Sequence, residues 1–124
     1  MPIREILGIT EFDAYTPEET RAALAAGEIV LIDVRTPQEY AVEHIEGALL
    51  MPMAFFDPRF LPPQDSRRIV LHCGSGMRST RMAERCAAAG FDRIAHMAGG
   101  MSAWKERGLP YIATDPATGG PVRK

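Results

Sequence analysis

The chain has 124 residues with a formal net charge of −2 at neutral pH, and 46 % of the residues are hydrophobic. These values are typical of one globular domain with its own core. The charge argues against a nucleic-acid-binding protein, which usually presents a basic face. The apolar run at residues 29–32 is far too short to cross a bilayer, and the charged N-terminal residues are unlike a signal peptide. Two cysteines make no disulfide framework, so we expect a reduced, cytoplasmic protein without nucleic-acid or membrane partners.

Helices are expected where capping residues precede a helical apolar periodicity. The segments Thr16–Glu19 and Thr36–Glu39 each contain a threonine, then a proline, and a glutamate three residues after the threonine. This pattern is a capping box with proline at the first helical position, so it predicts where two helices begin. The expected helices are residues 16–26, 36–42, 53–63 (short and irregular), 79–89 and 101–107.

Short apolar segments between these helices predict strands at residues 3–9, 29–34, 48–51, 69–72 and 94–97. Apolar strands that alternate with helices are typical of a three-layer α/β domain, in which helices flank a central, mostly parallel β-sheet. The last residues are rich in proline, glycine and polar side chains. We therefore expect one domain over residues 1–113 and a poorly ordered tail over residues 114–124.

The most informative stretch is Ile69–Ser79, in which an apolar strand ends at Cys73 and a helix follows. Two glycines let the loop curl so that successive N–H groups point at one spot, and the helix N-terminus adds its positive dipole end. Such a loop stabilises an anion, so we interpret Cys73 as a reactive cysteine with a lowered pKa. A buried structural cysteine is the alternative interpretation, which Arg78 at the helix start makes less attractive. Asp33 also lies at the carboxyl end of a strand, where ligands of such sheets bind.

The loop sequence Cys-Gly-Ser-Gly-Met-Arg-Ser resembles the active-site loop of the rhodanese-type sulfurtransferases. Three further stretches, within residues 33–40, 44–48 and 99–110, agree with that family and follow its order. The resemblance implies a single-domain, rhodanese-like fold and a Cys73 that carries sulfur as a persulfide. It implies a small-molecule sulfur donor and a thiol acceptor, either a small molecule or a protein, and no metal or organic cofactor is required.

In this chemistry Cys73 takes the outer sulfur of an anionic donor, for which we choose thiosulfate, and passes it to a thiol or to cyanide. Arg78 is expected to attract the donor, because its planar fork suits an oxyanion. The other residues expected to bind substrate are Gly74, Ser75, Gly76, Met77 and Ser79, with Asp33 and Arg35 in a supporting place. Arg35 is expected to pair with Glu39.

Other residues that could carry chemistry are expected to be structural. The three histidines have no metal-ligand spacing, and we interpret His44, His72 and His96 as packed, hydrogen-bonded side chains. Cys86 lies on the apolar face of its helix and too far along it to form a disulfide with Cys73.

Two alternative functions remain at this point. A cysteine phosphatase or arsenate reductase uses a similar loop, but with one residue more than the four between Cys73 and Arg78. A persulfide relay needs the same loop as the enzyme, whereas a rhodanese-shaped interaction module does not need the cysteine. The donor is also open, since the first four loop residues resemble mercaptopyruvate sulfurtransferases and the next three do not.

Overall fold

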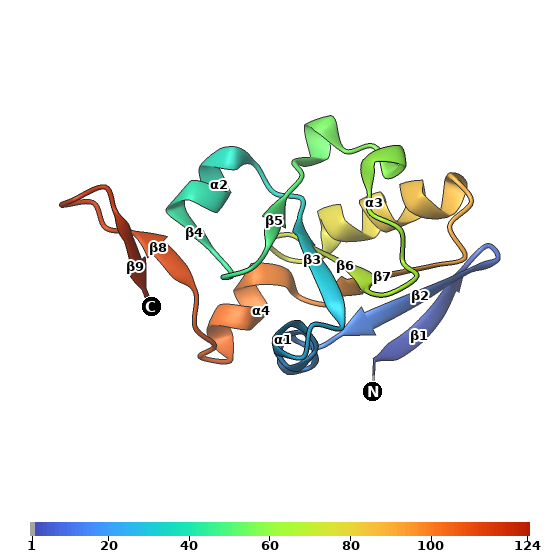
Figure 1. Ribbon diagram of the computed structural model, residues 1–124, viewed down its shortest axis with the longest axis horizontal. Coiled ribbons are helices and arrows are strands. Elements are labelled where there is room, and N and C mark those ends of the chain that lie inside the picture. The colour runs from blue at the N-terminus through green and yellow to red at the C-terminus, as the bar shows by residue number, and fades with distance from the viewer. Residues whose placement is uncertain (1) are drawn as a thin grey trace.

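The computed structural model describes residues 2–124, which form a central sheet with helices on both of its faces (Figure 1). Within these residues the central sheet has six strands in the order β1-β2-β7-β6-β3-β5. Neighbouring strands are parallel, except that β1 and β2 form an antiparallel hairpin at one edge. The strands are β1 Ile3–Leu7, β2 Thr10–Tyr15, β3 Ile29–Asp33, β5 Leu49–Leu50, β6 Arg68–His72 and β7 Arg93–Met97. The predicted α/β fold with a mostly parallel sheet is confirmed.

The two faces of the sheet bury two separate apolar clusters. On one face, α3 and the 3₁₀ turn η1 pack over strand residues that include Ile69 and Ile94. On the other, α1 and α4 pack over residues that include Leu31 and Val70. The helical elements are α1 Pro17–Ala25, α2 Pro37–Val42, η1 Met53–Phe55, η2 Pro58–Phe60, α3 Met77–Ala88 and α4 Gly100–Glu106.

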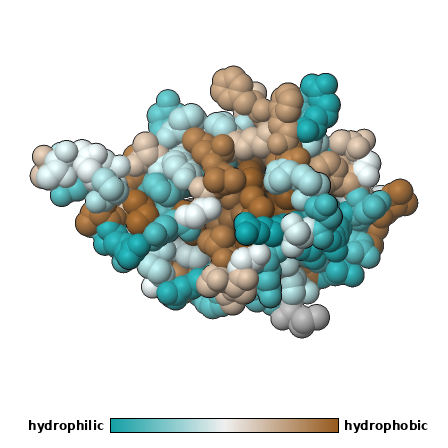
Figure 2. All heavy atoms as spheres, in the orientation of Figure 1, coloured by the Kyte–Doolittle hydropathy of each residue, from teal (hydrophilic) through white to brown (hydrophobic). Residues whose placement is uncertain are grey.

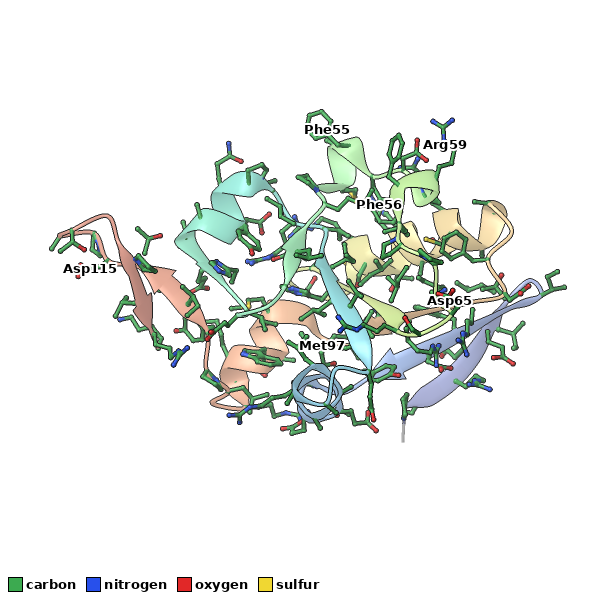
Figure 3. The ribbon with its side chains drawn as sticks, viewed as in Figure 1. Phe55, Phe56, Arg59, Asp65, Met97 and Asp115 are labelled. Carbon is green, nitrogen blue, oxygen red and sulfur yellow. The ribbon has the colours of Figure 1, made fainter. Side chains whose placement is uncertain are left out.

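Apolar side chains also reach the surface over η1. Figure 2 shows them gathered there and across the centre of the same view. Phe55 points into solvent and is 78 % exposed, whereas its neighbour Phe56 turns inward and is buried in the cluster under α3 (Figure 3). No helix among residues 2–124 is both long enough and apolar enough to cross a membrane.

Both capping boxes form where the sequence predicts them. The Thr16 hydroxyl accepts the Glu19 N–H at 3.1 Å, and the Glu19 carboxylate accepts the Thr16 N–H at 2.8 Å. Thr36 and Glu39 make the same reciprocal pair, with both distances 3.1 Å. These bonds satisfy main-chain donors that a helix start otherwise leaves unpaired, which is why four residues are enough to predict each start.

The strand predicted over residues 3–9 forms as β1 but ends at Leu7, because the chain turns at Gly8 and returns as β2, which was not predicted. β2 has no apolar run, since its sequence is Thr-Glu-Phe-Asp-Ala-Tyr. Its Asp13 is buried and binds two arginines, Arg4 at 2.8 Å and Arg68 at 3.0 Å. The ion pairs of the buried Asp13 carboxylate therefore stabilise β2, a strand that hydrophobic periodicity does not predict.

The expectation of a poorly ordered tail at residues 114–124 is also wrong. β8 (Ile112–Thr114) and β9 (Pro121–Arg123) form an antiparallel hairpin, and β8 pairs with β4 (Glu43–His44). Side chains fasten this hairpin to the domain: the Thr114 hydroxyl donates to the Ala41 carbonyl, and Arg123 pairs with Glu46 at 2.7 Å. Strands of two or three residues are too short to show a periodicity, and β4, which pairs with β8, lies far away from it in sequence.

Candidate active site

Cys73 lies directly after β6, at the carboxyl edge of the parallel sheet, and the loop from Gly74 to Gly76 leads from it into α3. α3 begins at Met77, two residues earlier than predicted, because Gly76 takes the left-handed conformation with φ +108° immediately before it. The Cys73 sulfur accepts the N–H of Gly76 at 3.1 Å and that of Ser79 at 3.4 Å. Main-chain donors of the loop and of the first helical turn thus converge on one sulfur atom.

These donors control the ionisation of the thiol. Burial raises the pKa of Cys73, but hydrogen bonds from the Ser79 N–H and hydroxyl and from the Gly76 and Ser75 N–H groups outweigh it and lower the pKa below its usual value. Cys86 provides the contrast within the same protein, since burial without such donors raises its pKa to about 12. Both cysteines are buried, so the loop geometry makes the difference between them.

The first turn of α4 holds the other side of the loop. The Met101 N–H donates to the Cys73 carbonyl at 2.8 Å, and the Ser102 N–H donates to the Gly74 carbonyl at 3.0 Å. Gly100 makes this approach possible, because a Cβ atom at that position would lie 2.3 Å from the Cys73 oxygen. The sequence predicted only a turn at this glycine, and its place in the site was missed.

A serine and a histidine lie beneath the loop. The Ser79 hydroxyl is 3.6 Å from the Cys73 sulfur and 2.9 Å from Nδ1 of His96, which comes from β7. The sequence predicts Ser79 as a residue that binds substrate. His96 was predicted as a packed, hydrogen-bonded residue, but nothing in the sequence indicated that its partner would be the serine facing the sulfur, 17 residues earlier.

Arg78 pairs with Glu39 through two bonds, of 2.7 Å and 3.0 Å. The hydrogen bond from Arg78 is the main reason that the pKa of Glu39 falls to about 2. The expected pair of Arg35 with Glu39 is therefore wrong: Arg35 binds Asp33 instead, with its Nε and Nη2 atoms 3.0 Å and 2.8 Å from the two carboxylate oxygens. Residues two apart at a strand end project to the same side, which favours this pairing.

The predicted site residues are not equally accessible. Ser75 on the loop and Met77 at the start of α3 are exposed, whereas Asp33 is fully buried and holds Arg35. A pocket of about 410 Å³ lies beside Gly74, and its walls come from α2, β4 and α4. The residues that line it are Arg35, Glu39, Glu43, Gly74, Met101, Ser102, Lys105 and Glu106.

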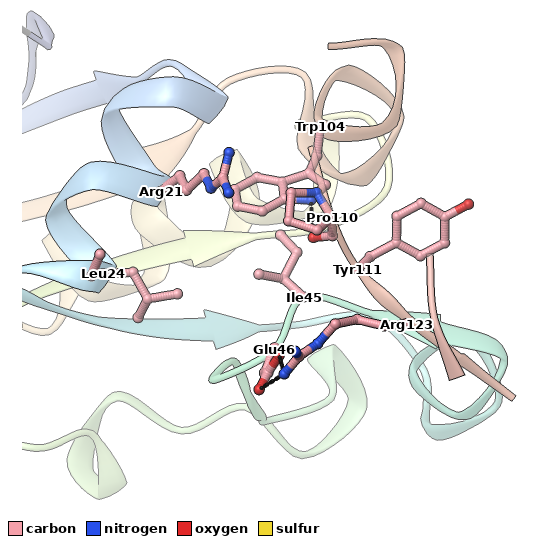
Figure 4. Close-up of a pocket in the computed structure, with 9 residues that line it drawn as sticks. Arg21, Leu24, Ile45, Glu46, Trp104, Pro110, Tyr111 and Arg123 are labelled. Carbon is pink, nitrogen blue, oxygen red and sulfur yellow. Dashed lines mark hydrogen bonds and ion pairs between the residues drawn. The ribbon is translucent and has the colours of Figure 1, made fainter. Parts of the chain in front are cut away.

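A second pocket of about 410 Å³ lies between α1, α4 and the C-terminal hairpin. Figure 4 shows Trp104 and Ile45 on its walls and the Arg123–Glu46 ion pair at its edge. Among residues 2–124, no cysteine, serine or histidine lines it. The Cys73 thiol therefore lies outside this pocket, in the loop that borders the first one through Gly74.

The structure so far defines an α/β protein with a cysteine whose thiolate is stabilised by a main-chain loop. Residues 16–107 match the family model of the rhodanese-like domain, and the chain belongs to that family. An uncharacterized protein of Synechocystis sp. is 38 % identical over 89 residues, which are 72 % of this chain and 50 % of that protein. A sulfurtransferase of Allochromatium vinosum is 34 % identical over 88 residues, which are 71 % of this chain and 82 % of that protein.

Solved structures agree with this assignment. The crystal structure of a rhodanese-like domain protein from Staphylococcus aureus has a TM-score of 0.63 and 29 % sequence identity, and the match covers 73 % of this chain and 89 % of that one. The chain spans half the length of the Synechocystis relative. The relatives and the solved structures thus agree with the rhodanese-like family.

Proposed function

We propose that this protein is a sulfurtransferase that carries a sulfane sulfur as a persulfide on Cys73, with thiosulfate as donor and a thiol or cyanide as acceptor. The observation that carries the proposal is the convergence of the Gly76 and Ser79 N–H groups on the Cys73 sulfur, at 3.1 Å and 3.4 Å. Donors fixed in this way stabilise the attacking thiolate and, after loading, the negative charge of the persulfide.

The reaction takes two displacement steps. The Cys73 thiolate forms a bond to the outer sulfur of thiosulfate, and the bond from that sulfur to the sulfonate sulfur breaks, so that sulfite leaves with the bonding electron pair. An acceptor thiolate then attacks the terminal sulfur of the persulfide, and the Cys73 thiolate is the leaving group. The protein alternates between a form with a free Cys73 thiolate and a form with a Cys73 persulfide, which predicts ping-pong kinetics.

Two features of the free protein affect how a donor is loaded. Cys73 has no exposed surface, so we propose that the exposed loop residues beside it shift when a donor enters. Arg78 is already held by Glu39, but a guanidinium has five N–H groups and this pair uses two of them. We propose that Arg78 binds the sulfonate of the donor with the remaining groups or by releasing Glu39.

The proposal is tested by intact-mass measurement after incubation with thiosulfate. We expect the protein to gain the mass of one sulfur atom, which cyanide then removes as thiocyanate. The Cys73→Ala variant should gain none, and the Cys86→Ala variant should gain as much as the unchanged protein. Loading of Cys73→Ala would refute the proposal. Loading by a protein persulfide but not by thiosulfate would indicate a persulfide relay.

A further inference from the structure

We propose that His96 is a positioning residue that takes up the proton of the Cys73 thiol through the hydroxyl of Ser79. Three side chains from different parts of the fold form a continuous chain: the Cys73 Sγ donates to Ser79 Oγ at 3.6 Å, and that oxygen lies 2.9 Å from Nδ1 of His96. The inference deepens the proposed function, since it concerns how the attacking thiolate is formed.

Burial makes such a path necessary. Cys73 and Ser79 have no exposed surface, whereas His96 keeps 8 % of its surface exposed. Main-chain N–H groups stabilise the thiolate, but they are donors and cannot accept the proton that the thiol must lose. The His72 ring is turned elsewhere, with Nδ1 3.3 Å from the Cys73 carbonyl and Nε2 3.5 Å from Asp33. His96 is thus the histidine connected to the sulfur by way of a hydroxyl.

The proton transfer balances with the groups present. A serine hydroxyl carries one hydrogen and can accept others. When the Ser79 hydroxyl donates to Nδ1 of neutral His96, the hydroxyl proton can pass to the ring. The Ser79 oxygen accepts the proton of the Cys73 thiol in the same step. The products are a thiolate and an imidazolium, and the serine is unchanged. The Ser79 hydroxyl also lies 3.1 Å from the Gly76 carbonyl, and the chain is interrupted whenever it donates there.

The surroundings of the ring suit a group that is neutral at rest and gains charge briefly. Burial lowers the pKa of His96, and Glu5 on β1 is the charged group that opposes this shift. The elements packed against the ring contribute Phe12 from β2, at 4.7 Å between ring centroids, and Ser79 and Cys73 from α3 and its loop. The Cys73 thiolate, once formed, and the Glu5 carboxylate therefore both stabilise the imidazolium.

The test is the pH dependence of Cys73 alkylation by iodoacetamide, because only the thiolate reacts. In His96→Gln we expect the midpoint of the rate profile to rise by about one pH unit, so that alkylation is about tenfold slower below the midpoint and equal above it. His44→Gln is the matched control, since His44 bonds the Tyr40 carbonyl at 2.9 Å and contacts no loop residue by hydrogen bond among residues 2–124. If alkylation of His96→Gln were slower by the same factor at every pH, His96 would be merely structural and the proposal would be overturned. A rate profile equal to that of the unchanged protein would also overturn it.

Ser79→Ala and the double variant add a second criterion. If Ser79 and His96 act as one chain, the midpoint of the rate profile in the double variant should shift by as much as in Ser79→Ala alone. If the two residues act independently, the shifts of the two single variants should add. If His96→Gln fails to fold, an NMR titration of the His96 ring tests the proposal instead. The proposal requires that the chemical shifts of the ring show an inflection at the pKa of Cys73 in the unchanged protein and none there in Cys73→Ser. Alkylation needs no sulfur donor, so a protein that shows the shift but forms no persulfide would refute the proposed function and leave this inference intact.

Discussion

The carbonyl oxygen of Cys73 accepts a hydrogen bond from the N–H of Met101 at 2.8 Å, which ties the reactive loop to the first turn of α4. In a trans peptide the carbonyl and the next N–H point in opposite directions. The Gly74 carbonyl is likewise held by the Ser102 N–H of α4, and the N–H that follows it is that of Ser75, one of the donors that lower the pKa of the thiol. A neighbouring helix thus helps to orient one of these donors.

This relationship predicts the effect of Gly100→Ala. The new Cβ would lie 2.3 Å from the Cys73 oxygen, and φ is +58°, so we expect α4 and the loop to separate, sulfur transfer to be lost, and stability to fall by more than about 2 kcal/mol. Gly108→Ala is the control, because it has a similar φ of +69° but open space, and it should cost about 1 kcal/mol with activity retained. Equal effects in chemical denaturation and in the thiocyanate assay would contradict this role of Gly100.

The predictions from sequence succeeded where the determining contacts are local. Each capping box places its helix through bonds between residues three apart. The Cys73 loop was predictable because its donors lie within six residues of the sulfur. β2 was missed because it has no apolar run, and the Arg78–Glu39 pair was missed because it joins residues 39 apart. Only the folded chain brings such groups together.

The ion pair of Arg78 and Glu39 predicts opposite effects of two substitutions. Arg78→Ala removes the cation beside the loop, so we expect KM for thiosulfate to rise about tenfold. Glu39→Gln removes the competing carboxylate, so we expect KM to fall about threefold. Steady-state kinetics with thiosulfate and cyanide measures both. Asp57→Asn is the control, since it frees Arg59 from a similar carboxylate pair at the start of η2, away from the loop. An unchanged KM in Arg78→Ala would exclude Arg78 from donor binding.

Asp13 predicts an acid-sensitive contribution to stability. The hydrogen bond from Arg4, helped by Arg68 and opposed by burial, lowers the pKa of this carboxyl below its usual 3.8. The unfolded chain then takes up a proton at a higher pH than the folded one does. The contribution is complete above about pH 5 and is lost as the pH falls through the lowered pKa. Urea unfolding between neutral pH and pH 3 should show this loss, and Asp13→Asn should flatten the profile there. A variant profile parallel to that of the unchanged protein would exclude Asp13 as its source.

The two cysteines predict a selective modification. Both are buried, but main-chain donors lower the pKa of Cys73, whereas burial raises that of Cys86 to about 12. A thiol reacts with an alkylating reagent as its thiolate, so at neutral pH iodoacetamide should modify Cys73 and leave Cys86 intact in the folded protein. Peptide mass mapping reads the sites, and the same reaction in urea, where both thiols have ordinary pKa values, is the control and should label both. Equal labelling in the folded state, or labelling of Cys86 first, would mean that the loop does not activate Cys73.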